Sequence, residues 1–589
     1  MKKLLYTLVF IILSSVVAHA QSVVTGTVTD TKGLPVIGAA VTVDGDVSAG
    51  AITDLDGKYS LTVSGNKAVI VFTCLSYVTA EVPLEGRSVL DVVLKEDSEL
   101  LDEVVVVGYG AMRRSDLTGS VTSVDIDESE SSRASSLDQM LQGKAAGVSV
   151  VANSASPDAA VSVRVRGVTS LNGSNEPLYV IDGVIMTPSE TPQMFTQGID
   201  NTGSDEDVNA MMGINPQDIA SMEILKDASA TAIYGSAGAN GVVLITTKSA
   251  NRDKPTIRAN VGVDVSTRYR EIEMLSLEEY AAYMEAKGQS TSHLYTDSTK
   301  TAFKVTPQNW QDFMMRPAVS QRYYLSINGR PKDMNYSFSL GYNKRDGIIR
   351  NTGSEQLTMR MNITRTLFRN FKVGTKTNFA VVNSEMTQGT SSTRLNASSS
   401  LMRSMMISRP YRSLTEDDDM DEDDFRGTPL QWVSDFRNTR REYRITPHMF
   451  AEWKILRWLE FKSSFGGDLR MSERMKWKGA SINSGTEGSI AASSDVLTYN
   501  WNLDNTLNFN KKIKKHRIQG TLGVTTSRSF VRTSVVEGWN IKEDQIKDKN
   551  INSAVNSRFS YMETAVSMNS YFARAVYNYA DRYLLTAIF

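Results

Sequence analysis

The chain has 589 residues, which is too long for one ordinary domain and suggests about three or four. Its net charge of −2 provides no overall basic field, so composition gives no support for nucleic-acid binding. The single cysteine, Cys74, excludes an internal disulfide and a cysteine metal cluster, and the four histidines lack metal-ligand or serine-hydrolase spacing. We therefore expect no catalytic residue, no bound metal and no cofactor.

The first twenty residues have the three parts of a secretory signal peptide. Lys2 and Lys3 give a positive start, Leu4–Val17 is mostly apolar, and Ala18–Ala20 is an A-x-A cleavage site. The apolar run is short for a bilayer span, and no later run approaches the roughly twenty apolar residues of a membrane helix. We therefore expect export, and any membrane-embedded part must be a β-barrel.

Residues 21–96 read as a small β-sandwich of short strands separated by turns. The expected strands are Val23–Thr29, Ala39–Asp44, Tyr59–Val63, Ala68–Thr73 and Val89–Leu94. Turn signals lie at Asp30–Gly33 and Asp54–Gly57. The second of these, Asp-Leu-Asp-Gly, weakly resembles the start of a calcium loop but lacks the later glutamate, so we favour a turn.

A valine-rich segment lies in the linker over residues 97–112. The stretch Leu101–Gly110, LDEVVVVGYG, is flanked by the polar segments Glu96–Glu99 and Arg113–Asp116. It is either a buried strand, as for any short apolar run, or an extended segment that adds itself to the sheet edge of another protein. The residues alone do not decide between these two readings.

Residues 113–250 mix helical and strand signals, as an α/β unit does. The expected elements are a short helix over Leu137–Gly147 and strands over Ser162–Gly167 and Leu178–Gly183. The helix would bury Leu137, Met140 and Leu141 on one face, and both strands would end in glycine turns.

The stretch from Ile214 to Lys248 closes this unit. It contains a strand at Met222–Leu225, an Ala-rich helix opened by Asp227, a glycine turn and a strand at Val242–Thr247. Asp227 is expected to cap the helix N-terminus, and Gly235 to end the helix in the left-handed conformation.

Three glycines in this stretch, Gly235, Gly238 and Gly241, suggest a phosphate loop at first sight. The order of elements argues against it, because a phosphate cradle places its glycines before a helix N-terminus that points at the anion. Here the glycines follow a helix and lead into a strand. We therefore assign them to a structural turn.

From Lys254 onward the residues alternate between apolar and polar. Clear examples are Thr256–Tyr269, Tyr336–Asn343 and Leu357–Thr364, and we count about eleven or twelve strand-like segments in all. One apolar and one polar face is typical of a membrane β-barrel with lipid outside and water inside. A soluble sandwich gives the same alternation.

The connections between these segments alternate between short and long, as the two ends of a barrel require. Lys511–Arg517, KKIKKHR, is expected to be a tight, solvated basic turn. Met386–Arg440 is a long loop in which eight of the nine residues Glu416–Asp424 are acidic. Calcium binding there, or in the polar segment between Val184 and Gly213, is the alternative to the favoured reading of plain solvation.

Several blocks together resemble one family. LQGKAAGVSV, VRVRG, EPLYVIDGV and the Ile214–Lys248 stretch follow the plug domain of the SusC/RagA family of TonB-linked outer-membrane transporters, in the same order. VTGTVTD, GLPVIGAAVTV and AGAITDLDGKYSLTV are similar to the carboxypeptidase-regulatory-like domain that opens many members. One departure is Ala237, where the family usually carries Arg in its YGSRGANG block.

The resemblance implies a mainly β chain with defined parts. These are a signal peptide over residues 1–20, a carboxypeptidase-regulatory-like β-sandwich over 21–96, a linker over 97–112, an α/β plug over 113–250 and an antiparallel transmembrane β-barrel over 255–589. A family barrel has 22 strands around its plug, and the 335 residues after Lys254 hold about half of them. We therefore expect an incomplete barrel and a truncated product.

The family pattern also assigns individual residues. It places a TonB box in the linker at Glu103, Val104, Val105, Val106 and Val107, with a shift of a few residues as the alternative. It implies a structural plug motif made of Gly167, Asp182, Gly183, Asp227, Tyr234, Gly235, Gly238, Asn240 and Gly241.

The function that the resemblance implies is TonB-dependent import of large nutrients, oligosaccharides or oligopeptides, across the outer membrane. Its expected partners are TonB on the periplasmic side and a SusD-like surface lipoprotein, with no nucleic acid and no enzymatic activity. One alternative is a TonB-coupled signalling receptor, which normally has an extra domain before its plug. The other is a non-transporting surface adhesion or structural protein.

Overall fold

The computed structural model describes residues 21–30, 33–36, 38–43, 46–64, 69–74, 79–94, 104–107, 110–113, 120–124, 126–134, 136–152, 155–157, 159–170, 175–186, 211, 213–250, 253–386, 401–412, 428–482, 488–541, 547–580 and 582–589. The chain divides into two compact units, one of residues 1–105 with 112–117 and one of residues 106–111 with 118–589. Among the helices of these residues, none combines the length and the apolar character needed to cross a bilayer.

The N-terminal unit is a β-sandwich, as the sequence predicts. One sheet has the order β4-β1-β7, formed by Lys58–Ser64, Gln21–Asp30 and Val92–Leu94. The other has the order β3-β2-β5-β6, formed by Asp46–Ile52, Ala40–Val43, Val69–Thr73 and Ala80–Pro83. Side chains from both sheets, such as Val28, Leu61 and Phe72, form one buried core.

Two strands of this unit were not expected from the sequence. β3 reads DVSAGAI and β6 reads AEVP, and their alternation is weak because most of the apolar positions are alanine. The turn at Asp54–Gly57 is confirmed, because the Asp54 side chain accepts hydrogen bonds from the backbone amides of Asp56 and Lys58, at 3.0 and 2.8 Å. That carboxylate is therefore engaged in its own turn.

The plug region contains a five-stranded sheet and a separate two-stranded sheet. The larger has the order β10-β15-β16-β13-β14, formed by Val121–Val124, Ile219–Leu225, Val242–Thr247, Leu178–Ile181 and Val184–Met186. The smaller pairs β11 (Val148–Ala152) with β12 (Val161–Val165). Most of the predicted strands are thus confirmed, and the strand expected at Met222 begins earlier, at Ile219.

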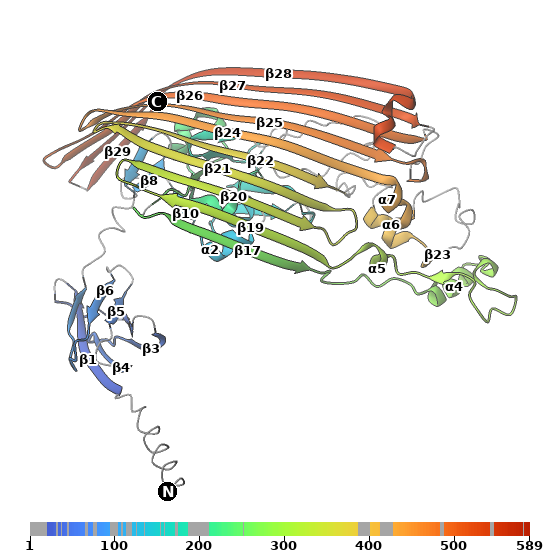
Figure 1. Cartoon of the computed structure of the whole chain (residues 1–589), viewed down its shortest axis with the longest axis horizontal. Coiled ribbons are helices and arrows are strands. Elements are labelled where there is room, and N and C mark those ends of the chain that lie inside the picture. Colours follow the sequence, from blue (N-terminus) through green and yellow to red (C-terminus); the bar gives the residue numbers. More distant parts are fainter. Residues whose placement is uncertain are drawn as a thin grey trace, which may run out of the picture. The chain divides into compact units, whose positions relative to one another are not determined.

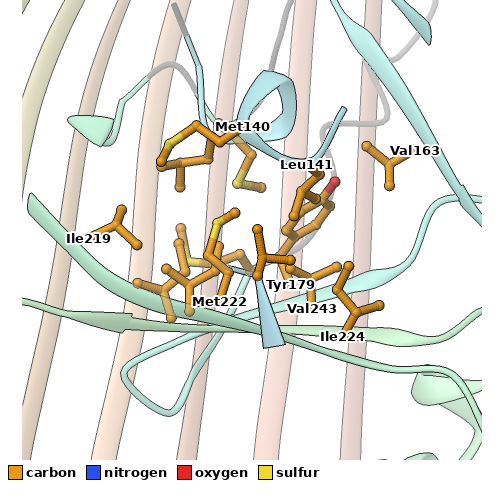
Figure 2. Packing of buried hydrophobic residues seen from close by; sticks show 14 of the residues in the cluster. Met140, Leu141, Val163, Tyr179, Ile219, Met222, Ile224 and Val243 are labelled. Atoms are coloured by element: carbon orange, nitrogen blue, oxygen red, sulfur yellow. The ribbon is translucent and has the colours of Figure 1, made fainter. Parts of the chain in front are cut away.

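The helix expected over Leu137–Gly147 is mostly absent. Only a short 3-10 helix, η2 (Asp138–Leu141), forms there, because Gly143 and Gly147 take positive φ values of 72° and 76° and turn the chain. The predicted buried face is nevertheless correct. Met140 and Leu141 pack with Met222 and Val243 in the plug core (Figure 2). A second short helix, α2 (Glu128–Arg133), precedes η2.

An antiparallel sheet of eleven strands follows the plug (Figure 1). In spatial order the strands are β17 (Thr256–Ser266), β19 (Ala318–Gly329), β20 (Met334–Asp346), β21 (Gly353–Phe368), β22 (Phe371–Glu385), β24 (Phe436–Leu456), β25 (Leu459–Lys478), β26 (Ser489–Ile513), β27 (His516–Ile541), β28 (Ala554–Tyr579) and β29 (Tyr583–Ile588). The sheet is not closed, so β17 and β29 are its edges among the described residues.

The alternation along these strands separates an apolar outer face from a polar face toward the plug. On β21, Met359 is 51% exposed, whereas Thr358 and Arg360 are buried. Arg360 contacts the plug, so the polar face is the inner one. This arrangement resembles the wall of an outer-membrane barrel rather than one half of a soluble sandwich, as the sequence and its resemblance predict.

The two ends of this sheet differ in their connections. Tight turns join β19 to β20, β21 to β22, β24 to β25, β26 to β27 and β28 to β29, which confirms the turn within Lys511–Arg517. The other end carries α4 (Leu277–Ala286), η5 (Ser292–Leu294), β18 (Thr306–Pro307), α5 (Trp310–Met314), α6 (Leu401–Ile407), β23 (Tyr411–Arg412), α7 (Pro429–Asp435), η6 (Ala480–Ile482) and η7 (Lys547–Ser553). The acidic run Glu416–Asp424 and most of the segment after Met186 lie outside the described residues.

Candidate functional site

The predicted TonB box forms a strand. Val104–Val107 is β8, and it pairs with β9 (Gly110–Arg113) in a two-stranded sheet. Glu103 lies outside the described residues. A sheet of two strands leaves backbone groups on its outer edges that can accept a further strand, which is the geometry of strand addition. The TonB-binding role of this segment stays a prediction.

The block predicted to close the plug has the expected order of elements. β15 leads through α3 (Ala228–Thr231) and the 3-10 segment η4 (Ala232–Gly238) into β16. Asp227 stands at the N-cap position of α3, but its side chain does not bond to the helix. The carboxylate instead accepts a hydrogen bond from the backbone amide of Ser120 and pairs with Arg166. Asp227 therefore fastens β10 and the turn after β12 to this block.

The three glycines of this block have structural roles, but the predicted conformation of Gly235 is wrong. Gly235 has a positive φ of 60°, but its ψ of −146° is not left-handed helical, and it lies where two 3-10 turns meet rather than at a helix end. Gly241 has φ 93°, and a Cβ there would lie 2.9 Å from Val165 of β12. A Cβ on Gly238 would lie 2.9 Å from the Thr231 carbonyl oxygen. None of the three faces an anion-binding helix end.

The structure brings the remaining motif residues to two places. The Asn240 side chain accepts a hydrogen bond from the Thr169 hydroxyl. Thr169 lies two residues after Gly167, and Gly167 takes a φ of 102° in the turn that follows β12. Tyr234 is half-buried in η4. Asp182 and Gly183 form the turn between β13 and β14, with φ values of 52° and 93°. Two successive positive φ values are what a type I′ hairpin turn requires.

Asp182 is the centre of a buried ion-pair cluster between the plug and the sheet. Its carboxylate lies 2.9 Å from Nη2 of Arg360 on β21 and 2.6 Å from Nζ of Lys376 on β22. The Thr247 hydroxyl donates a hydrogen bond to the same carboxylate, and its backbone amide donates another at 3.3 Å. We call Asp182, Thr247, Arg360 and Lys376 the Asp182 cluster.

The electrostatics of the cluster favour the charged carboxylate. Burial by itself would raise the pKa of Asp182, but the charges of Lys376 and Arg360 outweigh that effect. Hydrogen bonds from Lys376 and Thr247 act in the same direction, and together they lower the pKa of Asp182 to about 2. The turn is therefore anionic at any physiological pH, and it is held by two cations.

A second buried ion pair lies under the next plug strand. Arg444 of β24 makes two contacts with Asp468 of β25, at 2.7 and 3.0 Å, and both side chains are fully buried. The Arg444 guanidinium also lies 3.8 Å from the sulfur of Met186 on β14. A two-point guanidinium–carboxylate contact is rigid, so it presents a fixed platform to the plug.

Hydrogen bonds fasten the plug to further strands of the sheet. They join Gln217 to Asn260 of β17 at 2.7 Å, Asp218 to Tyr324 of β19 at 2.8 Å, Ala250 to Asn335 of β20 at 3.0 and 3.1 Å, and the Gly213 carbonyl to Asn378 of β22 at 2.8 Å. The contact runs across adjacent strands from β17 to β24. The plug is therefore seated along this whole part of the inner face.

A small cavity of about 30 Å³ lies between the Asp182 turn and the sheet. It is lined in part by Asp182, Arg360, Lys376 and His448, and it is large enough for about one water molecule. His448 is buried, and its Nδ1 has no hydrogen-bond partner among the described residues. Among those residues, His, Cys, Asp and Glu form no group of three that could hold a metal ion.

The cations of the Asp182 cluster were not singled out in the sequence. Arg360 and Lys376 lie 178 and 194 residues after Asp182, so sequence spacing gives no sign of the contact. One signal was present: Arg360 stands on the polar face in the middle of an alternating strand, where its charge needs a partner.

Two protein families match parts of the chain. The "TonB-dependent Receptor Plug Domain" matches residues 113–242, and the "CarboxypepD_reg-like domain" matches residues 24–106. The TonB-dependent receptor SusC of Bacteroides thetaiotaomicron is 39% identical over 370 residues, which cover 62% of this chain and 34% of SusC. The TonB-dependent receptor P26 of Formosa agariphila is 32% identical over 588 residues, covering 97% of this chain and 56% of P26.

Solved structures match the fold. The RagAB peptide importer in its "open-open" state aligns with a TM-score of 0.66 at 20% identity, covering 82% of this chain and 55% of the matched chain. The structure of the RagAB peptide transporter aligns with a TM-score of 0.63 at 19% identity, covering 79% and 54%. The chain thus spans about half the length of these proteins, and this likeness concerns the fold alone.

Proposed function

The chain belongs to the SusC/RagA family of TonB-dependent receptors, which are outer-membrane β-barrel proteins, and from this membership we propose that it acts in TonB-driven import of large nutrients. One observation carries the proposal: a plug is fastened by a buried ion-pair cluster to the polar inner face of a sheet whose outer face is apolar. The valine strand β8 precedes that plug in the chain. In this proposal TonB pulls on β8, and the pull opens the plug that is seated in the sheet.

In the sequence, β8 and β9 come before β10 of the plug sheet. β10 is the edge strand of the order β10-β15-β16-β13-β14, so a pull on the chain before it acts on a strand paired along one side. Val121 of β10 pairs with Leu225 of β15, and the Ser120 amide is bonded to Asp227. Force applied at an edge strand breaks the hydrogen bonds between one pair of strands at a time, which needs less force than breaking those of the whole sheet at once.

The Asp182 cluster lies at the far side of the same sheet. β13 and β14, which carry the Asp182 turn, are the last two strands from β10. A pull that loosens β10 and β15 therefore leaves the cluster intact until late. We propose that partial opening, with the Asp182 turn still bound, is the working range of the gate.

The partners and substrates follow from the family. We propose that TonB adds a strand to β8 from the tight-turn side, and that a SusD-like lipoprotein covers the end that carries α4 to α7. Oligosaccharides and oligopeptides are the proposed substrates, which agrees with the description of the RagAB relative as a peptide importer. Transport of this kind needs no catalytic residue.

Strand addition by TonB is tested by removing one backbone donor. A Val107→Cys reporter in a Cys74→Ser background gives a single thiol for crosslinking to TonB in cells. Val105→Pro deletes an amide from β8 and should abolish both the crosslink and nutrient uptake, whereas Val105→Ile keeps the strand and should preserve both. A Val105→Pro protein that still crosslinks and imports would refute the role of β8. Uptake that is unaffected by deleting Glu103–Val107 would favour the adhesion alternative.

A further inference from the structure

The tight turns of the eleven-stranded sheet carry an excess of positive charge. Together with the strand ends next to them, the turns cover residues 330–333, 367–370, 454–460, 511–517 and 580–582, and these segments hold eleven Lys and Arg side chains against three Asp and Glu. We call these five segments together the basic rim.

The basic rim is one continuous surface, because backbone hydrogen bonds link each turn to the next. The bonds run from the Thr366 amide to the Asp333 carbonyl at 2.9 Å, from Lys454 to Asn370 at 2.8 Å, from Asn510 to Trp458 at 2.9 Å and from Ala580 to Lys515 at 2.8 Å. The spacing of the turns is therefore fixed by the sheet. Charges on neighbouring turns face the same surroundings.

Exposed apolar side chains at the strand ends and in one turn of the basic rim argue against a plain aqueous setting. Phe368 is 69% exposed beside Arg369, Ile513 is 49% exposed between Lys512 and Lys514, and Trp458 is 39% exposed. Turns that face water are normally built from Gly, Asn, Asp, Ser and Pro, whereas Trp458 stands in the turn between β24 and β25. An exposed phenylalanine and isoleucine among lysines instead fit a boundary between hydrocarbon and charged headgroups.

Lys511 and Trp458 show this pairing directly. The Lys511 ammonium lies 5.0 Å from the centre of the Trp458 ring, although Lys511 is at the end of β26 and Trp458 is in the turn between β24 and β25. Trp is favoured at the level of lipid headgroups, and lysine places its charge in the polar layer while its stem lies on apolar surface. One aromatic ring with a cation above it therefore marks the depth of the interface.

We propose that the basic rim binds the phosphate headgroups of anionic phospholipids in the membrane leaflet at the tight-turn end. Short turns lie on the periplasmic side of outer-membrane barrels, where the leaflet is made of phospholipid. Lysines and arginines near such a surface each favour anionic over neutral lipid by roughly fivefold. The proposal rests on the outer-membrane location of the chain and is independent of import.

Tryptophan quenching by brominated lipids tests the site. The chain is reconstituted in phosphatidylcholine vesicles that contain an equal mole fraction of brominated phosphatidylglycerol or brominated phosphatidylcholine. The difference between the chain and its Trp458→Phe variant isolates the emission of Trp458. Brominated phosphatidylglycerol should quench Trp458 more strongly than brominated phosphatidylcholine, and added salt should reduce the difference because it screens the charges.

A variant with Lys511, Lys512, Lys514 and Lys515 all changed to Gln should lose most of the lipid preference, roughly tenfold or more in relative affinity. Quenching by brominated phosphatidylcholine checks that this variant still inserts. Lys287→Gln is the matched control, because Lys287 lies 4.6 Å from the Tyr283 ring at the opposite end of the sheet. It should leave the preference unchanged.

Three outcomes would overturn the proposal. Equal quenching by both lipids would show an inserted rim without selectivity for anionic headgroups. If neither brominated lipid quenches Trp458, the turn that contains Trp458 lies in water. Relief of phosphatidylglycerol quenching by lipopolysaccharide alone would place the rim in the other leaflet. Loss of import in the Val105→Pro protein with normal lipid preference would leave this proposal standing.

Discussion

Asp182→Asn is the sharpest test of how the plug is held. The substitution keeps the size of the side chain and the hydrogen-bonding shape of the turn, but it removes the charge that faces Arg360 and Lys376. Two cations would then stand beside a neutral amide in a buried setting. Removing one partner of a buried ion pair costs about 3–5 kcal/mol, because the remaining charge has lost its compensation.

The pKa of Asp182 gives a second estimate of the same contact. Its fall from 3.8 to about 2 corresponds to roughly 2 kcal/mol of stabilisation of the charged form, at 1.36 kcal/mol for each pKa unit. Because the pKa is depressed in the folded protein, this contribution is complete above a pH of about 4. It is lost as the pH falls toward about 2. The free energy obtained from the pKa is lower than the cost of removing one partner, because it omits the cost of leaving two cations unpaired.

Hydrogen–deuterium exchange measures the effect locally. At neutral pH, Asp182→Asn should speed exchange of the β13 and β14 amides on the order of 10²-fold, which is the factor for about 3 kcal/mol. Asp227→Asn is the matched control, because Asp227 pairs within the plug and should leave β13 and β14 unaffected. Exchange within twofold of the unmodified protein in Asp182→Asn would refute the role of the cluster. A second change, Lys376→Met, should recover part of the loss by removing one unpaired cation.

Three further predictions concern single sites. Gly241→Ala should lower the free energy of plug unfolding by about 1–3 kcal/mol in urea, since its Cβ would lie 2.9 Å from β12; Gly143→Ala, with an open surrounding, should cost only about 1 kcal/mol. Arg444→Met should lower the free energy of unfolding by about 1–3 kcal/mol in thermal unfolding, because Asp468 loses its two-point partner but keeps the longer contact with Arg470 at 3.5 Å; an unchanged transition would contradict the buried pair. Burial, and then Asp91, raise the pKa of Tyr59 to about 12, so Tyr59 should ionise only near pH 12. The absorbance difference between the chain and Tyr59→Phe measures this ionisation. The stability that the neutral Tyr59 contributes is complete below pH 10 and is lost between about pH 10 and 12.

Much of the fold could be predicted because its signals are local. The alternation in Leu357–Thr364 repeats every two residues, so the sequence itself shows which side chains share a face of β21. The order strand, helix, glycine turn and strand in Ile214–Lys248 is likewise contained within one short stretch. The predicted helix over Leu137–Gly147 was wrong for a local reason too, since the two glycines destabilise a helix more than burial of its apolar face would stabilise it.

The candidate site was harder to predict, because it depends on register between distant strands. Arg360 meets Asp182 only because β21 is placed so that this residue, and not its neighbours two positions away, faces the Asp182 turn. A shift of two residues along β21 would keep the alternation and break the ion pair. Asp227 shows the same limit, since its N-cap position was evident but its partners Ser120 and Arg166 were not.

The distribution of charges on the inner face has a consequence for the proposed gating. Arg444 and Asp468 pair within the sheet, so they stay neutralised when the plug moves. Arg360 and Lys376 pair with the plug itself, and departure of the Asp182 turn exposes both cations. An anionic turn attracted to two cations of the sheet resists departure, which would keep the turn bound during partial opening.

The same cluster becomes weaker once water enters. In a dry interface with low effective dielectric, opposite charges at about 3 Å attract strongly, and in water the same attraction is several-fold smaller. The cavity beside Asp182 has room for about one water molecule, so the cluster is already at the border of a wetted space. Opening that extends to β13 and β14, which line that space, would widen it and weaken the ion pairs without breaking them by force. The gate would therefore resist small disturbances and yield abruptly once the interface is wet.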